Sequence, residues 1–215
     1  MAVDGGPVTN AGAPARASLN RVRQLASQCR ACALWRDATQ TVFGEGDPHA
    51  RVMLVGEQPG DREDRSGRPF VGPAGAMLDR ALEAAGIDRT SVYVTNSVKH
   101  FKFEERGKRR IHKKPNLEEV RACKPWLDDE IARVGPALVV LMGATAVQSV
   151  LGKSAKVTAD RGRLIDSGGN LFVITAHPSS ILRMPDGDSR REALDALVED
   201  LRVAQQALAH QRKRA

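Results

Sequence analysis

Four short apolar segments recur along this chain and constrain its fold more than any other feature. They cover residues 51–56, 91–96, 137–142 and 171–175, and they are rich in Val, Leu and Ile rather than alternating between polar and apolar residues. Nearly continuous apolar runs of this length are typical of strands buried on both faces of a parallel sheet. We therefore expect these segments to form four strands of one sheet.

Helical patterns separate and follow these segments. The pattern over 74–86 places apolar residues on one face and ends at a glycine, and a capping box opens the pattern over 116–134. Pro125 predicts a kink or a delayed start in the second of these helices. We expect a short helix over 145–151 and a long amphipathic helix over 190–208.

The alternation of strands and helices predicts an α/β fold, a three-layer α/β/α sandwich with a central, mainly parallel four-stranded sheet. A Ser-Gly-Gly-Asn turn at 167–170 predicts a hairpin that leads into the last strand. In such sheets ligands bind beyond the carboxyl ends of the strands. The segments that follow the strands are therefore where we expect functional residues.

Length and composition predict a single domain. With 215 residues and 41% hydrophobic content, the chain can bury a substantial core. We expect residues 1–17 to be a disordered leader, residues 18–209 to be the domain and residues 210–215 to be a basic tail. The chain has no apolar run of roughly 20 residues and no signal-peptide pattern, so we expect a cytoplasmic protein that does not bind membranes. We also expect a monomer.

A basic run over 99–114 follows the second expected strand. It holds eight Lys or Arg residues, two His and two Phe in sixteen positions, and the whole chain has a net charge of +7. Positive charge with interleaved aromatic residues favours a nucleic-acid contact, although a solvated charged loop is the alternative for a charge run alone. His112 ends the Lys-Arg-Arg-Ile-His part of this run, so its imidazole would meet whatever the arginines hold.

Two further segments follow strands. Gly56-Glu-Gln-Pro-Gly-Asp would project the Glu57 carboxylate at the end of the first strand, and it lacks the spacing of a nucleotide-triphosphate loop. His177-Pro-Ser-Ser would place an imidazole at the same edge. A solvated turn and a histidine bound to the backbone are the structural alternatives. Phe70 fits either the core or a platform for a planar base.

Three cysteines suggest a metal centre. Cys29 and Cys32 form a Cys-x-x-Cys pair, and Cys123 lies far along the chain. Their odd number and the expected cytoplasmic setting disfavour a disulfide framework. With His100 as the fourth ligand they would hold either zinc or an iron–sulfur cluster. Spacing alone favours zinc slightly, because zinc is the commoner occupant, and leaves both open.

Taken in order, these motifs resemble those of the uracil-DNA glycosylase superfamily, specifically the family 4 enzymes and, within that neighbourhood, the UdgX proteins. The resemblance covers the chain from Cys29 to the final helix. The matching motifs are Cys-x-x-Cys, Gly-Glu-Gln-Pro-Gly, Pro-Phe-Val-Gly-Pro-Ala-Gly, Thr-Asn-Ser-Val-Lys-His, Lys-Arg-Arg-Ile-His and His-Pro-Ser-Ser-Ile-Leu-Arg. The resemblance implies a [4Fe–4S] cluster on Cys29, Cys32, His100 and Cys123. His100 stands where ordinary family 4 enzymes have their third Cys, as it does in UdgX proteins.

The resemblance also implies roles for individual residues. Phe70 would stack on a uracil flipped out of DNA, Asn96 would bind its edge, and His177 would stabilise negative charge on the departing base. Gln58 and Asp61 would belong to the same uracil-binding site. The residues expected to contact DNA are Lys99, Lys108, Arg109, Arg110, Ser179, Ser180 and Arg183.

The expected reaction is removal of uracil from DNA, single-stranded and also double-stranded, followed by covalent capture. Glu57 would support the cationic sugar, and His112 would bond to its C1′ as the corresponding His does in UdgX proteins. A conventional glycosylase with water as the nucleophile is the alternative. A catalytically silent nucleic-acid-binding module with a structural metal is a third reading, which the set of residues at the strand ends argues against.

Overall fold

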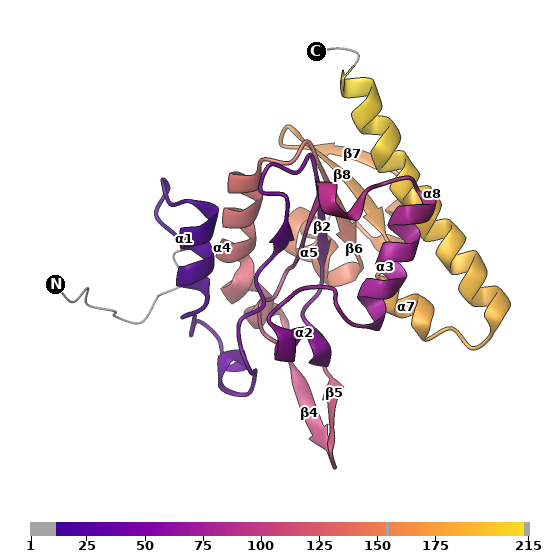
Figure 1. The fold of residues 1–215 in the computed structure, drawn as a ribbon. Helices are drawn as coiled ribbons and strands as arrows, with labels where there is room; N and C mark the ends of the chain where they lie inside the picture. The colour runs from indigo at the N-terminus through magenta and orange to yellow at the C-terminus, as the bar shows by residue number, and fades with distance from the viewer. Residues whose placement is uncertain (1–11, 154, 213–215) are drawn as a thin grey trace.

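A six-stranded sheet forms the middle layer of the computed structural model, which describes residues 12–153 and 155–212 (Figure 1). Its strands are β1 Glu45–Gly46, β2 Val52–Gly56, β3 Val92–Asn96, β6 Leu138–Met142, β7 Leu164–Ser167 and β8 Asn170–Thr175. They lie in the order β1-β3-β2-β6-β8-β7, and the four central strands run parallel. These four correspond to the four predicted segments, so the predicted α/β/α fold with a mainly parallel central sheet is confirmed.

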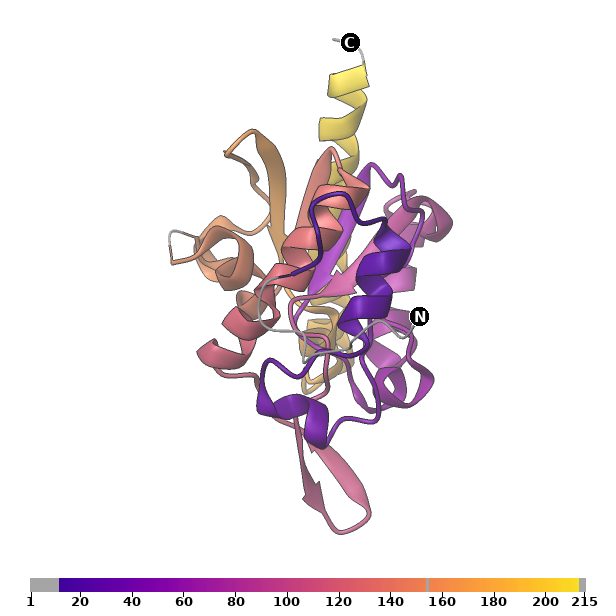
Figure 2. The same cartoon turned by 90° about the vertical axis from the view of Figure 1, so that its left-hand side faces the viewer.

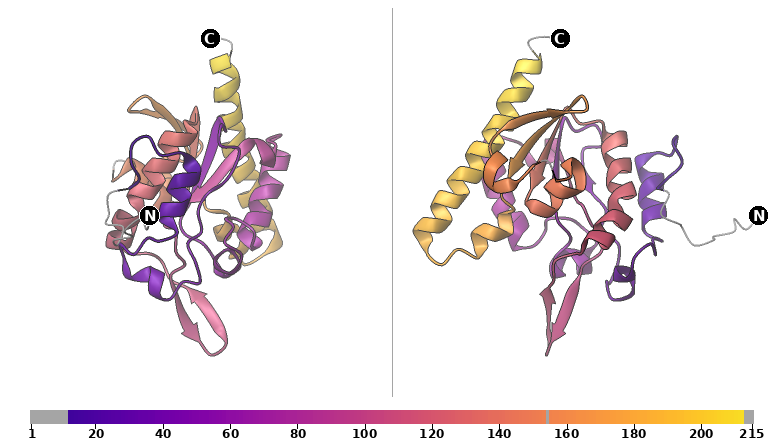
Figure 3. Two further views of the ribbon diagram at one scale, coloured as in Figure 1. Left: turned by 60° about the vertical axis from the view of Figure 1, so that its left-hand side comes forward. Right: turned by 180° about the vertical axis from the view of Figure 1, so that it is seen from behind.

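Helices cover both faces of the sheet. They are α1 Leu19–Ala26, α2 Asp61–Ser66, α3 Pro73–Ala84, α4 Leu117–Val134, α5 Ala144–Leu151, α6 Val157–Asp160, α7 Pro178–Leu182 and α8 Gly187–Arg212, with 3-10 helices η1 Ala33–Arg36 and η2 Arg89–Ser91. α3 and α8 pack on one face, α4 and α5 pack on the other, and α1 lies against the outer side of α4 (Figures 1 and 3). Consecutive residues of a strand point to opposite faces, so Val52 belongs to the first hydrophobic core and Met53 to the second.

α4 shows that Pro125 does not delay the start of the helix. The helix includes this proline and begins at Leu117 without delay. The predicted capping box is present: Oδ1 of Asn116 accepts the Glu119 N–H at 2.8 Å, and Oε2 of Glu119 accepts the Asn116 N–H at 2.7 Å. The cap satisfies N–H groups that the first helical turn would leave without partners, so the helix starts at its capped end despite the later proline.

Antiparallel strands extend the sheet at both edges. β7 pairs with β8 as the predicted hairpin, and its turn contains Gly168 and Gly169, both with positive φ. β1 pairs with β3 over two residues and was not predicted, because a two-residue strand leaves no hydrophobic pattern.

The basic run forms a second, separate hairpin rather than a loop. β4 (Phe103–Arg106) pairs antiparallel with β5 (Arg109–His112) around Gly107, whose φ is +60°. The hairpin projects from the end of the domain at which the parallel strands terminate (Figures 1 and 2). His112 lies at its base, opposite Phe103.

The structure describes part of the predicted leader and part of the predicted tail. The predicted disordered leader lies outside the described residues as far as residue 11, but residues 12–17 pack along α4. Arg133 donates hydrogen bonds to the carbonyls of Ala17 and Pro14, and Asp129 accepts one from the Ala13 N–H. α8 continues to Arg212, so the predicted basic tail is helical over its described part. No helix in the described ranges is long and apolar enough to cross a membrane.

Candidate functional site

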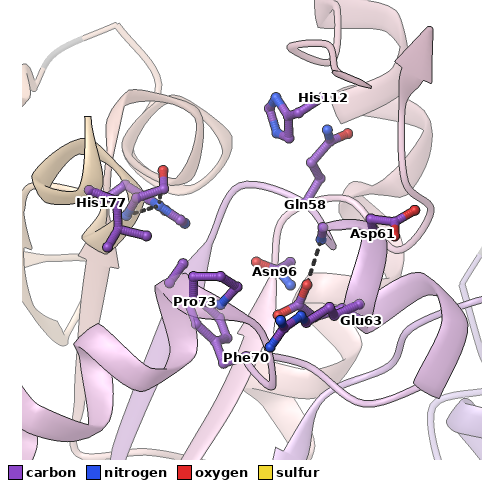
Figure 4. Close-up of a pocket in the computed structure, with 13 residues that line it drawn as sticks. Gln58, Asp61, Glu63, Phe70, Pro73, Asn96, His112 and His177 are labelled. Atoms are coloured by element: carbon purple, nitrogen blue, oxygen red, sulfur yellow. Dashed lines mark hydrogen bonds between the residues drawn. The ribbon is translucent and has the colours of Figure 1, made fainter. Parts of the chain in front are cut away.

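A cavity of about 410 Å³ opens at the carboxyl ends of the parallel strands (Figure 4). The elements that contribute to it are distant in the sequence: β3, β5, the loop after β2, the loop after β8, and helices α2, α3 and α7. The residues that line it are Gln58, Gly60, Asp61, Arg62, Glu63, Phe70, Pro73, Ala74, Asn96, His112, His177, Ser179 and Leu182. All the residues predicted to bind uracil are therefore found around one cavity.

Three of these side chains converge on Gly56, the last residue of β2. A Cβ built on Gly56 would lie 2.4 Å from Oδ1 of Asn96, 2.7 Å from Cζ of Phe70 and 3.3 Å from Nε2 of His177. The Phe70 and His177 rings are stacked with their centroids 6.1 Å apart. Glycine is required at the end of β2 because any larger residue would separate these groups.

Two buried polar atoms in this cluster have no hydrogen-bond partner among the described residues, namely Oδ1 of Asn96 and Nε2 of His177. The other ring nitrogen of His177, Nδ1, accepts the backbone N–H of Ser179 at 3.2 Å. Burial lowers the pKa of His177 to about 4, so the ring is neutral at pH 7. A neutral ring with an accepting Nδ1 carries its proton on Nε2. In this cluster, Asn96 therefore offers an unpaired acceptor and His177 offers an unpaired donor.

Phe70 is held in place by its backbone. Its φ is +55°, an uncommon conformation for a residue with a side chain, and it packs closely on α3. A Cβ on Gly75 would lie 1.9 Å from the Phe70 carbonyl oxygen, so only glycine permits this contact. The buried carboxylate of Glu63 accepts the N–H of Gly60 at 3.1 Å and that of Gly72 at 2.7 Å, which ties together the two loops that border the cavity.

Glu57 lies beside the cavity, between the hairpin and α5. Its Oε1 is 3.3 Å from Nε2 of His112, and its Oε2 accepts a hydrogen bond from Oγ1 of Thr145. Burial alone would raise the pKa of Glu57, but hydrogen bonds from His112 and Thr145 and the nearby imidazole of His177 outweigh it, so the pKa lies below its usual value. Glu57 is therefore a carboxylate at neutral pH, in contact with a half-exposed imidazole.

Gln58 contacts the base of the hairpin with both ends of its amide. Its Nε2 donates to the carbonyls of Lys102 (3.2 Å) and Lys113 (2.9 Å), and its Oε1 accepts the Lys102 N–H at 3.1 Å. The prediction placed this amide against uracil. In this structure Gln58 lines the cavity and also fastens the strand that ends at His112, because residues 102 and 113 lie opposite each other in the hairpin.

Arg110 fastens the same hairpin to α2. Its guanidinium pairs with the carboxylates of Asp61 and Asp64, and it lies over the rings of Phe101 and Phe103. The side chain is only 12% exposed. In this structure its donors are bound to two carboxylates, and the predicted contact of Arg110 with DNA stays a prediction. The two Phe rings stack on each other beneath it, 5.1 Å apart.

Lys99 is buried in this structure, which disfavours its predicted contact with DNA. Its side chain is 1% exposed and its ammonium group pairs with the fully buried Glu130. It also donates to Oγ1 of Thr95 and to the Asn96 carbonyl, both at 2.7 Å. A lysine directly after a strand end can point into the core when a buried carboxylate lies there, and sequence alone did not reveal that partner.

The remaining predicted DNA contacts lie on two sides of the cavity. Lys108 and Arg109 are exposed near the tip of the hairpin. On the other side, Ser179 lines the cavity and Arg183 donates to its Oγ at 3.3 Å. Oγ of Ser180 donates to the carbonyl of His177 at 2.7 Å, which stabilises the start of α7.

The three cysteines belong to one hydrophobic cluster between α1 and α4. Sγ of Cys29 accepts the indole N–H of Trp126, and Sγ of Cys123 accepts the backbone N–H of Lys99, both at 3.1 Å. Burial raises the pKa of the Cys123 thiol to about 12, and it also raises the pKa of Cys32. In the described ranges, no group of three or more His, Cys, Asp or Glu side chains is close enough to hold a single metal ion.

His100 has the ring state that a metal ligand needs. Burial lowers its pKa to about 4, so the ring is neutral at pH 7. Its Nε2 is 2.9 Å from Oγ1 of Thr41, whose own proton is donated to the Ala26 carbonyl. The Nε2 of His100 is therefore the donor in this pair, and Nδ1 keeps its lone pair. The donor set of three thiols, two of which accept an N–H, and one neutral imidazole thus fits an iron–sulfur cluster in its chemistry.

Sequence reasoning missed two residues of the site. Thr145 follows the end of β6, at the same edge as the predicted residues, so its position was a usable signal. Glu63 is the third helical residue after Gly60, and a Glu at that position is typical of a capping box.

Comparisons with known proteins agree with this architecture. Residues 43–202 match the model of the uracil DNA glycosylase superfamily. The chain is 39% identical to the type-4 uracil-DNA glycosylase of Thermotoga maritima over 176 residues, which cover 81% of this chain and 88% of that protein. It is 36% identical to the type-4 uracil-DNA glycosylases of Pyrobaculum aerophilum, over 78% of this chain and 86% of that protein, and of Sulfurisphaera tokodaii, over 68% and 66%.

Proposed function

We propose that this chain, which belongs to the uracil-DNA glycosylase superfamily, removes uracil from DNA and then remains bonded to the abasic sugar through His112. The first part of the proposal, uracil excision, is supported by the family and by the cavity. The second part, covalent capture, is supported by the contact between His112 and Glu57 together with the resemblance to UdgX proteins.

The unpaired acceptor and donor in the cavity carry the assignment to uracil. Oδ1 of Asn96 would accept the N3–H of uracil, and the Nε2–H of His177 would donate to a uracil carbonyl oxygen. Cytosine has no proton on N3, so it would leave the Asn96 oxygen buried without a partner, which costs free energy. The Phe70 ring would stack on the flipped base.

The same groups assist departure of the base. When the bond between C1′ and N1 of uracil breaks, its electron pair leaves with uracil, and the sugar becomes an oxocarbenium-like cation. A neutral His177 donates a hydrogen bond to the oxygen on which negative charge develops. The Glu57 carboxylate stabilises the positive sugar.

His112 then competes with water for C1′. The imidazole nitrogen that carries a lone pair bonds to C1′, and the ring becomes a cation. It then loses its N–H proton, for which Oε1 of Glu57, 3.3 Å from Nε2, is an acceptor already in place. The new C–N bond has a poor leaving group, so the protein would react once. The alternative is turnover with water as the nucleophile, and the hairpin would then serve only to bind DNA.

The hairpin explains how an exposed imidazole reaches the sugar. Gln58 and Arg110 anchor its two strands to the loop after β2 and to α2, so His112 faces the cavity although its side chain is 49% exposed. The exposed Lys108 and Arg109 at the tip, and Arg183 on the other side of the cavity, are available for the phosphates of single-stranded or double-stranded DNA. The site is complete in one chain, in keeping with a monomer.

We also propose a [4Fe–4S] cluster on Cys29, Cys32, His100 and Cys123. Each ligand of such a cluster binds a different iron, so the ligands lie farther apart than those of a single ion. The N–H donors to two of the sulfurs and the free Nδ1 of His100 support this assignment. The cluster would tie the segment before β1 to α4.

A denaturing gel tests the reaction. The wild-type protein, incubated with a uracil-containing single strand, should give an adduct that survives heat and detergent, whereas the same strand with thymine should give none. The variant His112→Ser should give no adduct but should release uracil and turn over, because water can then reach C1′. If the wild type releases uracil without an adduct, or if peptide mapping places the bond on another residue, capture by His112 is wrong.

A further inference from the structure

Thr145 is a buried hydroxyl whose contact with Glu57 neither the motifs nor the family resemblance explains. It is the second residue of α5 and is 3% exposed. Its Oγ1 donates to Oε2 of Glu57. Buried hydroxyls are normally paired, so the contact itself is ordinary, but its position beside the reacting groups is not.

The two oxygens of Glu57 have different partners. Oε2 accepts from Thr145, and Oε1 faces Nε2 of His112. Glu57 lies on a loop and the His112 side chain is half-exposed, so these two residues do not by themselves fix the angle of the carboxylate. α5 is the regular helix among the three elements that meet here.

α5 is itself well anchored. The N–H of Gly143, the residue before the helix, donates to the Thr175 carbonyl at 2.9 Å, which joins the ends of β6 and β8. Farther along α5, Oγ of Ser149 is 2.9 Å from Oγ of Ser97, and Ser97 donates to the Gly56 carbonyl at 3.0 Å. The helix is therefore tied to the backbone directly before Glu57 as well as to its side chain.

We propose that Thr145 is a positioning residue for Glu57, and that its hydrogen bond to Oε2 turns Oε1 toward His112. The inference rests on the proposed function, because it assigns to Thr145 the orientation of the proton acceptor used in capture. Without the bond the carboxylate can rotate away, His112 loses its acceptor, and water takes a larger share of the cationic sugar.

The hydrogen bond from Thr145 also helps to keep Glu57 ionised, which a proton acceptor requires. The groups that face Glu57 are His112 from the hairpin, Thr145 from α5 and His177 from the loop after β8. Burial favours the protonated carboxyl, and the donors oppose it. Removal of the Thr145 hydroxyl should therefore raise the pKa of Glu57 and move the acid limb of the reaction to higher pH.

The test compares Thr145→Val, which keeps the shape of the side chain, with Thr145→Ser, which keeps the hydroxyl. Thr175→Val is the matched control, because Thr175 is another buried threonine that donates to a carboxylate, that of Asp200, at 2.6 Å. In one assay, a uracil-containing strand is mixed with excess protein, and adduct formed per uracil released is measured. In the other, the pH dependence of uracil release is measured in the His112→Ser background with and without Thr145→Val.

Thr145→Val should lower the adduct per uracil released about tenfold, Thr145→Ser should restore it, and Thr175→Val should leave it unchanged. In the His112→Ser background, Thr145→Val should raise the midpoint of the acid limb by about one pH unit. If Thr145→Val does not fold, Thr145→Ala replaces it, because alanine favours the helix.

An unchanged ratio in folded Thr145→Val, or an equal loss in Thr175→Val, would overturn the inference. A wild-type protein that forms no adduct would overturn capture instead. The acid limb of the His112→Ser background would then still show whether Thr145 acts on Glu57.

Discussion

Nε2 of His112 lies 3.3 Å from Oε1 of Glu57, although one residue ends the second strand of a projecting hairpin and the other follows a strand of the central sheet. In the proposed reaction this contact would bring the nucleophile and its proton acceptor together at the edge of the cavity. It depends on the anchoring of the hairpin by Gln58 and Arg110. The cavity and the anchoring of the hairpin can each be tested by a separate variant.

Uracil release should be independent of pH between about pH 8 and pH 5. The pKa of His177 lies near 4, so the ring does not change charge as the pH falls through 6.5, and the low pKa of Glu57 keeps it ionised over the same range. Release should change only at lower pH, where His177 gains a proton near pH 4 and Glu57 becomes protonated. Single-turnover release of uracil by the wild type measures this, because His112 then remains in place as a donor to Glu57. A step in rate centred near pH 6.5 would show that the charge state of His177 is wrong.

Gly56→Ala should reduce uracil release about 100-fold. The added Cβ would lie 2.4 Å from Oδ1 of Asn96, so either the amide or the Phe70 ring must move away from the base. Gly187→Ala is the control, since a Cβ there meets nothing within 4 Å. Equal rates for both variants would show that uracil does not enter between these residues.

Gln58→Ala should reduce capture more than release. The change removes three hydrogen bonds to the base of the hairpin, so His112 should reach C1′ less often and adduct per uracil released should fall about fivefold to tenfold. Gln205→Ala, which removes a hydrogen bond from α8 to the Gly86 carbonyl, should have no effect on the ratio. A parallel loss of release and capture would instead point to a contact between Gln58 and uracil.

Lys99→Met should lower the free energy of unfolding by about 3–5 kcal/mol, because it leaves the buried Glu130 carboxylate without its cation. Adding Glu130→Gln should restore part of the loss, since the unpaired charge is then gone. Denaturant unfolding measures both. If Lys99→Met is as stable as the wild type but binds DNA with a weaker salt dependence, Lys99 reaches the phosphates after all.

Purified protein should be brown, with about four irons per chain. Cys123→Ser should lose both colour and stability, because the proposed cluster would connect the segment after α1 to α4. Iron analysis and visible absorption after anaerobic purification give the result. Stoichiometric zinc without iron would contradict the cluster.

Much of the site followed from local sequence because its residues stand directly after strands. Apolar runs locate the strands, parallel strands end at one edge, and Asn96 and His177 were therefore expected to meet. Position relative to the strands did not predict that Lys99 is buried and Lys108 is exposed. Both lie in one basic run, but one occupies a buried position with a carboxylate partner and the other is exposed near a hairpin tip.

Local sequence was enough to predict the α/β/α fold, the edge at which the site lies and the residue types gathered there, because short-range patterns of hydrophobicity decide which segments become buried strands. Which of those residues are available for the reaction depends on contacts between distant segments. Gln58 and Arg110 are bound to the hairpin and to α2, Lys99 is bound to Glu130, and Thr145 is bound to Glu57. Each pairing joins segments that are distant in the sequence, and the distances between such segments are set by packing of the whole domain rather than by any local pattern.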